Sequence, residues 1–332
     1  MLIGMKIVTL LLVLTISFMA PVASVFFVKF HPIDEVEYIK NFIAPDGGMY
    51  ESPQAEVYKE WTDATALSTL CFIHADPIKY GKEIRNALDW LVSMQRSDVP
   101  LFYDYVDSGT KAMDVDDAVL YRSAWASIAL LEGYRLYRDQ RYYDVAVRLQ
   151  NWEQDVDGGW RSRYNYEYGL KTLRENALML LYLTWMGNRD KAKITVQWIL
   201  SMENPEGGFN AGEDVNMVHK LRWSDQNALA VWALKKADEK FDFDLSAVLD
   251  RWVNNYVPDV LDTSIYGTSL LWCFKPEPNM DGRRCLNWIK RWLNEDHSYG
   301  IGLLNGKEER RTNSETHSLT TLADMCAYVG RF

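Results

Sequence analysis

Acidic side chains open several helix-like segments that are rich in Ala and Leu. They are Asp63, Asp116 with Asp117, Glu175, Asp225, Asp262 and Glu315. A helix N-terminus favours an acidic cap, worth about 0.5–2 kcal/mol, so capping alone explains any single member of the set. If the segments share one end of a ring, however, mutual repulsion raises some of the carboxyl pKa values. A carboxyl group with a raised pKa stays protonated near neutral pH and can act as a proton donor. The candidate catalytic residues are therefore Asp116, Asp117, Glu175 and Asp225.

The densest acidic group is Asp114-Val115-Asp116-Asp117. If a helix begins at Asp116 or Asp117, Asp114 lies before its first turn and can cap backbone amides two or three residues on. Asp116 and Asp117 then differ by about 100° around the helix, so only one of them points squarely into the ring. Three aspartates in four residues also arise readily by chance in an acidic chain.

Aromatic, basic and further acidic residues near this rim are the candidate substrate-binding groups. The chain holds 13 Trp and 19 Tyr, which are side chains that stack against sugar rings. Aromatic residues on helices usually pack in the core, whereas those in loops are free for binding. The candidates are Asp63, Trp160, Tyr164, Arg174, Trp223 and His317.

Charge and motif content exclude several classes of function. The net charge of -10 would repel a phosphate backbone, so nucleic acid is not expected as a partner. The five His are dispersed without zinc-ligand spacing, and no phosphate-binding glycine loop or serine nucleophile elbow is present. We therefore expect no metal and no cofactor.

The N-terminus carries a segment for export or anchoring. Residues 7–28 contain no charged side chain, and Lys6 and Lys29 flank them. This run is long enough to span a bilayer, while Ala20 to Ser24 offers a signal-peptidase site, so residues 1–28 are either a signal peptide or a membrane anchor. We expect an extracytoplasmic protein, secreted or in contact with the membrane through residues 7–28. The four Cys are expected to be small core residues, although Cys273 and Cys285 could form a bridge in an oxidising compartment.

A glycine turn recurs along the chain and reveals an internal repeat. It occurs as Asp46-Gly47-Gly48-Met49, Asp157-Gly158-Gly159-Trp160 and Glu206-Gly207-Gly208-Phe209, with a degenerate copy at 298–302. Amphipathic segments precede these turns, and segments that are apolar nearly all round follow them. Because helices of the second kind are buried and those of the first kind face solvent, the alternation predicts two concentric rings of helices.

The predicted fold is all-α, an (α/α)6 toroid of helical hairpins that forms a single domain over residues 33–332. About six amphipathic helices, one of them at 33–43, make the outer ring. The inner ring is expected at 62–74, 116–138, 173–186, 224–236, 263–274 and 314–329.

The hairpins resemble those of known toroids. Residues 87–95 and 197–209 are similar to the repeats of terpenoid cyclases and protein prenyltransferases, and secreted six-hairpin glycosidases and polysaccharide lyases use comparable hairpins. Asp114 to Asp117 also matches the Asp-x-Asp-Asp motif of class II terpene cyclases, in which the middle Asp protonates the substrate. That resemblance implies Asp116 as the acid, although Ala118 stands where the family has Thr.

Three functions remain open. A carbohydrate-active enzyme, hydrolase or lyase, fits export, acids and loop aromatics, and residues 158–177 loosely resemble a stretch of secreted pectate-lyase-type toroids. In that reading Arg161, Arg163, Lys171 and Arg174 are nearby cations. A class II cyclase with Asp116 as acid is the alternative, and a toroid that only binds is the third. We rank the carbohydrate-active enzyme first, with an oligosaccharide or small molecule as substrate.

Overall fold

The structure is a computed structural model, and it describes residues 32–51, 59–114, 118–164, 169–222 and 224–255, with 302–304, 307–309 and Thr321. The predicted N-terminal segment and the inner helices expected at 263–274 and 314–329 lie outside these ranges, apart from Thr321, which is helical. Within the ranges, no helix is both long enough and apolar enough to cross a bilayer.

Most of the described chain is helical, and short antiparallel strands connect the helices. The helices are α2 (Pro32–Ile39), η1 (Lys40–Phe42), α3 (Thr62–Ala75), α4 (Gly81–Ser93), α5 (Leu120–Tyr137), α6 (Gln140–Ala146), η2 (Val147–Asn151), α7 (Leu173–Met186), α8 (Arg189–Ser201), α9 (Ser224–Phe241) and α10 (Ser246–Asn255). The strands are β1 (Lys59–Trp61), β2 (Tyr105–Asp107), β3 (Lys171–Thr172), β4 (Gly212–Glu213), β5 (Val218–His219), β6 (Gly302–Leu304) and β7 (Lys307–Glu309). β1 pairs with β2, β6 with β7, and β3, β4 and β5 form a sheet in that order.

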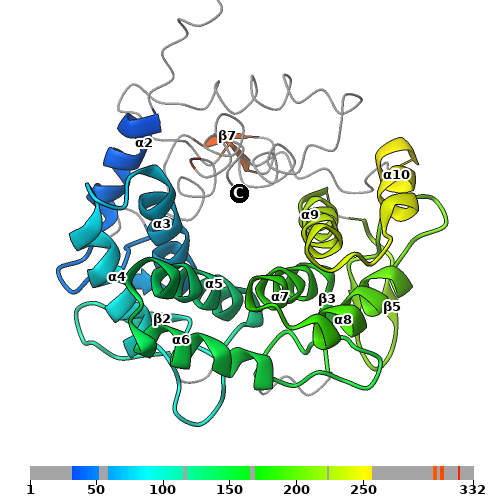
Figure 1. Cartoon of the computed structure of the whole chain (residues 1–332), viewed down its shortest axis with the longest axis horizontal. Coiled ribbons are helices and arrows are strands. Elements are labelled where there is room, and N and C mark those ends of the chain that lie inside the picture. The colour runs from blue at the N-terminus through cyan, green and yellow to red at the C-terminus, as the bar shows by residue number, and fades with distance from the viewer. Residues whose placement is uncertain are drawn as a thin grey trace, which may run out of the picture.

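The helices form two curved layers (Figure 1). Helices α3, α5, α7 and α9 make the inner layer, each packed against the next, while α4, α6, α8 and α10 lie outside them. The inner helices are buried on nearly every side, as the apolar segments predict; in α3 all residues from 62 to 72 are buried. The alternation of inner and outer helices is thus confirmed for the described residues. Cys71 is buried in α3, as expected for a small core residue.

The second inner helix begins later than the sequence predicts. We expected it to start at Asp116 or Asp117, but α5 starts at Leu120. Tertiary contacts hold the residues before it extended: the Val119 amide donates to Asp104 Oδ1 at 3.0 Å, and the Leu120 amide donates to the Ser162 carbonyl at 2.9 Å. The expected helix start at Asp116 or Asp117 is therefore wrong, and these two residues lie outside the described part of the chain.

A polar side chain ties each described inner helix to the turn before it. In every case the fourth helical residue accepts a hydrogen bond from a backbone amide just after the outer-helix turn. The pairs are Thr65 with Met49 at 2.9 Å, Ser123 with Phe102 at 3.0 Å, Asn176 with Trp160 at 2.7 Å and Asn227 with Phe209 at 2.6 Å. Because a buried amide without a partner is costly, this clamp fixes the rotation of each inner helix.

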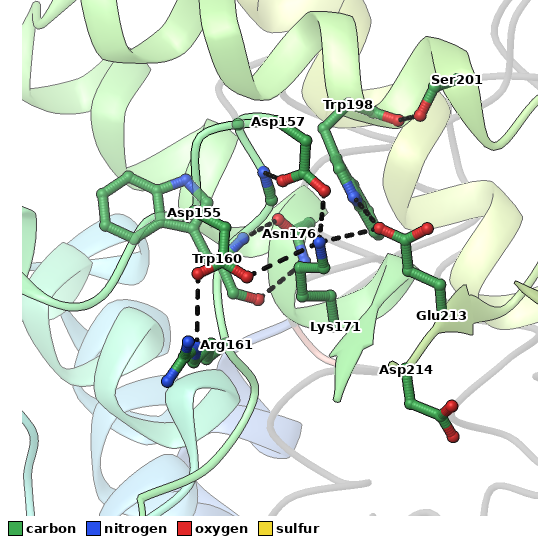
Figure 2. Close-up of polar contacts among 12 residues, drawn as sticks. Asp155, Asp157, Trp160, Arg161, Lys171, Asn176, Trp198, Ser201, Glu213 and Asp214 are labelled. Carbon is green, nitrogen blue, oxygen red and sulfur yellow. Dashed lines mark hydrogen bonds and ion pairs between the residues drawn. The ribbon is translucent and has the colours of Figure 1, made fainter. Parts of the chain in front are cut away.

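A lysine joins three carboxylates beneath the second glycine turn (Figure 2). The Nζ atom of Lys171 contacts Asp157 and lies 2.8 Å from Glu213 Oε1 and 3.7 Å from Asp155 Oδ2. Trp198 Nε1 donates to the same Glu213 oxygen at 2.9 Å. Burial acts to raise the pKa of Asp157, but Lys171 and the Gly159 amide outweigh it and hold that pKa below its usual value of 3.8. Only 9% of the Lys171 side chain is exposed, so this lysine is buried beneath the turn.

The first glycine turn contains the same chemical arrangement. Lys111 Nζ lies 2.7 Å from Asp46 Oδ2 and 3.0 Å from Glu60 Oε1, and Trp90 Nε1 donates to Glu60 at 3.0 Å. Burial raises the pKa of Glu60. Lys111 follows β2 whereas Lys171 lies in β3, so the two repeats reach one arrangement from different chain positions.

Replacing Gly158 by Ala should destabilise the protein more than replacing Gly187 by Ala. Both glycines have positive φ, +93° and +77°, but a Cβ on Gly158 would lie 2.5 Å from the Ile194 carbonyl oxygen, whereas one on Gly187 would meet nothing within 4 Å. Gly158→Ala should therefore lower the free energy of unfolding by more than about 1 kcal/mol. Urea denaturation of both variants measures it, and equal losses would show that the close approach to Ile194 has no cost.

Replacing Lys171 by Met should leave the partly buried Glu213 and the exposed Asp157 without their cation. We expect a loss of about 1–2 kcal/mol at neutral pH, less than for a fully buried pair because solvent screens Asp157, compared with almost none for the exposed control Lys193→Met. Because the pKa of Asp157 is lowered, its stabilising contribution is present above about pH 4 and is lost as the pH falls through its folded value. The difference in unfolding free energy between wild type and Lys171→Met should shrink on acidification; a constant difference would contradict this account.

Candidate active site

The first turns of the inner helices meet at one end of the ring. Each begins directly after an outer turn and is held by the same clamp, so equivalent residues lie at equivalent places. Because the fourth residue points outward to its turn, the second and third residues whose side chains are described, rotated from it by about 200° and 100°, turn toward the ring centre and the preceding inner helix; of Asp225 only the backbone is placed. We call these residues and Asp104 the inner rim. They are Asp63, Ala64, Tyr121, Arg122, Arg174, Glu175, Asp225 and Gln226.

On one side of the inner rim, Arg122 joins two buried carboxylates. Its Nε donates to Asp63 Oδ2 at 3.3 Å, its Nη1 contacts Asp104, and its guanidinium lies 4.6 Å from the Trp61 ring centroid. Asp63 Oδ1 also accepts from the Ala64 amide at 3.0 Å, so this predicted substrate-binding acid bonds to the first turn of its own helix as well as to Arg122. The arrangement places a rigid, negatively biased edge between α3 and α5.

On the next side, Glu175 and Arg174 form a second pair. Arg174 Nη2 donates to Glu175 Oε1 at 3.1 Å, and the guanidinium lies 4.6 Å from the ring centroid of Tyr121 on α5. Thr172 caps α7 by accepting from the Glu175 amide at 3.4 Å. Only 3% of the Glu175 side chain is exposed, and its Oε2 has no hydrogen-bond partner in the described part of the chain. One oxygen of this carboxylate is thus held and the other is open.

The chain around Asp116 and Asp117 is anchored at the inner rim. Residues 115–117 lie outside the described residues, so the side chains of this pair are not placed. Before them, the Asp114 amide donates to the Tyr105 carbonyl at 3.1 Å; after them, the Ala118 carbonyl accepts from the Tyr164 amide at 3.1 Å. The amide of Val119 then donates to Asp104. Both ends of the short segment are therefore fixed beside the rim.

The predicted substrate-binding aromatics have different positions. Trp160 is fully buried, and its Nε1 donates to Thr195 Oγ1 at 2.8 Å, so the expectation that it stacks on a sugar is corrected: it is a core residue of the glycine turn. Tyr164 is half-buried, and its ring centroid lies 4.6 Å from the guanidinium of Arg96. Trp223 and His317 lie outside the described residues, as does the side chain of Asp225, whose backbone is the second residue of α9.

Sequence reasoning missed Arg122, Asp104 and Gln226. Arg122 and Gln226 emerge once each inner helix is aligned by its fourth residue, a signal present in the sequence as Thr65, Ser123, Asn176 and Asn227. Asp104 precedes β2 and is found only through its contacts with Val119 and Arg122. Of the four candidate catalytic acids, the structure brings the backbones of Glu175 and Asp225 to one rim and anchors the segment that carries the other two.

Two other features of the described residues are separate from the inner rim. A cavity of about 480 Å³ lies at the third glycine turn, where Phe209, Val248 and Arg251 help to line it. Arg251 there pairs with Glu203 at 3.1 Å. Among the described residues, no group of three His, Cys, Asp or Glu side chains has the arrangement needed to hold a metal ion.

No protein-family model matches the chain, and a search of curated proteins finds no match either. Solved structures do match. An inactive variant of an α-1,6-mannanase of Salegentibacter sp. with α-1,6-mannotriose has a TM-score of 0.66 at 12% identity, over 89% of this chain and 97% of that chain. A family 76 α-mannanase of Bacteroides thetaiotaomicron has 0.68 at 10%, over 91% and 97%. Cellobiose 2-epimerase of Bacillus thermoamylovorans has 0.71 at 12%, over 89% and 97%.

These likenesses concern glycan-processing toroids, one of the groups that the sequence resembles. The resemblance to terpenoid cyclases stays a prediction. At identities this low, what the comparisons establish is that the chain shares the helical toroid fold of these enzymes.

Proposed function

We propose that the chain is a glycoside hydrolase whose active site is the inner rim, with Asp116 and Asp117 as the catalytic carboxylates. Glycoside hydrolysis needs one carboxylic acid to protonate the leaving oxygen and one carboxylate to activate water or attack the sugar. An aspartate pair beside further buried acids supplies groups of this type. Glu175 and Asp225 are the next candidates for either role.

The observation that carries this proposal is the position of the pair in the chain. Asp116-Asp117 is the only pair of consecutive aspartates in the sequence, and the described residues on either side of it are hydrogen-bonded close to the inner rim, Asp114 to Tyr105 and Val119 to Asp104. The α-1,6-mannanase of Salegentibacter was solved as inactive variants in which two consecutive aspartates are replaced by Asn or by Ala. A chain with the same fold and one such pair is reasonably tested first on α-1,6-mannan.

The lyase alternative needs a cation available for a uronate. Arg174 is paired with Glu175, Arg161 lies 2.7 Å from Glu153, and Lys171 is buried among carboxylates beneath the glycine turn. These three cations therefore favour hydrolysis over elimination. The cyclase alternative keeps Asp116 as acid, and the binding alternative uses the rim without chemistry. Export remains part of the proposal, because a glycan substrate outside the cell fits residues 1–28 as a signal or anchor.

One panel of substrates separates these functions. Purified protein would be incubated with α-1,6-mannan, starch, cellobiose, polygalacturonate and squalene, and the products separated by chromatography. New reducing ends from a neutral polysaccharide support the hydrolase. Unsaturated uronates would indicate a lyase, conversion of cellobiose without cleavage an epimerase, and cyclised squalene a cyclase. Binding of a glycan without any product would leave only the binding protein.

Asp116→Asn and Asp117→Asn should each lower turnover of the substrate found by at least about 100-fold, because each removes a group that carries or accepts a proton. Both variants should fold, since Asn keeps the shape. Asp114→Asn is the matched control and should leave turnover close to that of the wild type. Rates from reducing-end assays and melting temperatures would be compared, and near wild-type turnover in Asp116→Asn and Asp117→Asn would remove the pair from the mechanism.

A further inference from the structure

Two buried oxygen atoms of the inner rim have no hydrogen-bond donor. They are Oε2 of Glu175 and Oε1 of Gln226, and neither has a partner within the described ranges. A carboxylate oxygen and an amide oxygen are both acceptors only. Buried polar atoms in native proteins nearly always have a partner, so a pair of open acceptors indicates that something outside these residues supplies the donors.

The two acceptors occupy equivalent positions. Glu175 is the third residue of α7 and Gln226 the third residue of α9, and these helices pack side by side (Figure 1). Their fourth residues, Asn176 and Asn227, clamp the glycine turns in the same way, so both helices have the same rotation. The open acceptors are therefore at one level of the ring, on neighbouring walls.

Solvent reaches the Arg174–Glu175 pair at Arg174. Its side chain is 37% exposed, whereas that of Glu175 is 3% exposed. Since Arg174 holds Oε1 of Glu175 and lies over the Tyr121 ring, it fixes the carboxylate without covering both of its oxygens. A ligand that reaches Glu175 does so beside this guanidinium.

The charges of the rim select against an anionic ligand. Among the described side chains of the inner rim, the carboxylates Asp63, Asp104 and Glu175 outnumber the guanidiniums of Arg122 and Arg174. Arg122 contacts Asp63 and Asp104, and Arg174 contacts Glu175. A uronate carboxylate would add negative charge beside these acids, and it has no hydrogen to donate to the open oxygens. A sugar hydroxyl donates a hydrogen bond and carries no charge.

We propose that Glu175 and Gln226 form a subsite that binds hydroxyl groups of a neutral sugar ring and thereby restricts the enzyme to neutral glycans, excluding polyuronates. This inference rests on the proposed function, because it names the substrate class and two substrate-binding residues of the same site. Arg174 is a positioning residue in it, since it acts through the Glu175 carboxylate.

The test measures binding apart from turnover. In a protein carrying Asp116→Asn and Asp117→Asn, calorimetry would give dissociation constants for neutral tetrasaccharides, α-1,6-mannotetraose, maltotetraose and cellotetraose, and for tetragalacturonate. We expect one neutral tetrasaccharide to bind and tetragalacturonate not to bind. Adding Glu175→Gln should weaken binding of the neutral sugar by about 10- to 100-fold, because the amide presents either an N–H group or an uncharged oxygen in place of the charged carboxylate oxygen. Gln226→Met should weaken it as well, and Gln226→Glu should retain it.

Two controls separate a lost contact from a structural defect. Glu132 on α5 is likewise paired with an arginine, Arg135, but lies three turns along the helix from the rim, so Glu132→Gln should leave the dissociation constant unchanged. Monodeoxy analogues of the bound sugar give a second readout. For the hydroxyl that Glu175 binds, the losses of binding free energy caused by removing the hydroxyl and by Glu175→Gln should not be additive. If Glu175→Gln caused a structural defect instead, its loss would add to that of every deoxy analogue equally.

The outcomes distinguish this inference from the proposed function. If a neutral glycan is hydrolysed and bound but Glu175→Gln and Gln226→Met bind it as tightly as the parent, the subsite is wrong and the hydrolase stands. Tighter binding of tetragalacturonate than of every neutral sugar overturns the neutral-ring selection. If no sugar of the panel is bound or cleaved, the hydrolase proposal and the subsite both fail.

Discussion

The hydrogen bond from a backbone amide of each turn to the fourth residue of the following inner helix is the constraint on which the structure depends. The amide is buried, so it needs a partner, and Thr65, Ser123, Asn176 and Asn227 supply one with a short side chain on the outer face of the helix. Once that face points outward, the helix geometry turns the second and third residues of the inner helix toward the ring centre. The clamp thus creates the rim without specifying its chemistry.

The residue types at the rim positions differ from one inner helix to the next. In consecutive helices the third residue is Ala64, Arg122, Glu175 and Gln226, while the clamp beside it changes only among Thr, Ser and Asn. The packing beneath the glycine turns gives these positions rigid support: the lysine clusters hold the turns, and the turns hold the helices. Preorganisation of this kind allows a carboxylate such as Glu175 to stay buried with one oxygen held and one open.

Sequence periodicity predicts the larger features well, because burial of a whole helix leaves a pattern over many residues. The alternating helix types, the glycine turns and the first turns at Asp63, Glu175 and Asp225 follow from it. The start of α5 does not, because the Val119 amide bonds to Asp104, a tertiary partner that no local pattern shows. The burial of Lys171 depends likewise on Glu213, far along the chain, and the buried indole N–H of Trp160 finds its acceptor in Thr195 of α8.

A structure of the protein carrying Asp116→Asn and Asp117→Asn, with the neutral oligosaccharide that binds it most tightly, tests the central claim that the inner rim is the ligand site. The account predicts sugar at the N-terminal ends of α5, α7 and α9, with a hydroxyl within hydrogen-bond distance of Glu175 Oε2. Sugar bound instead in the cavity beside Phe209 and Arg251, or on the outer helices, would contradict it.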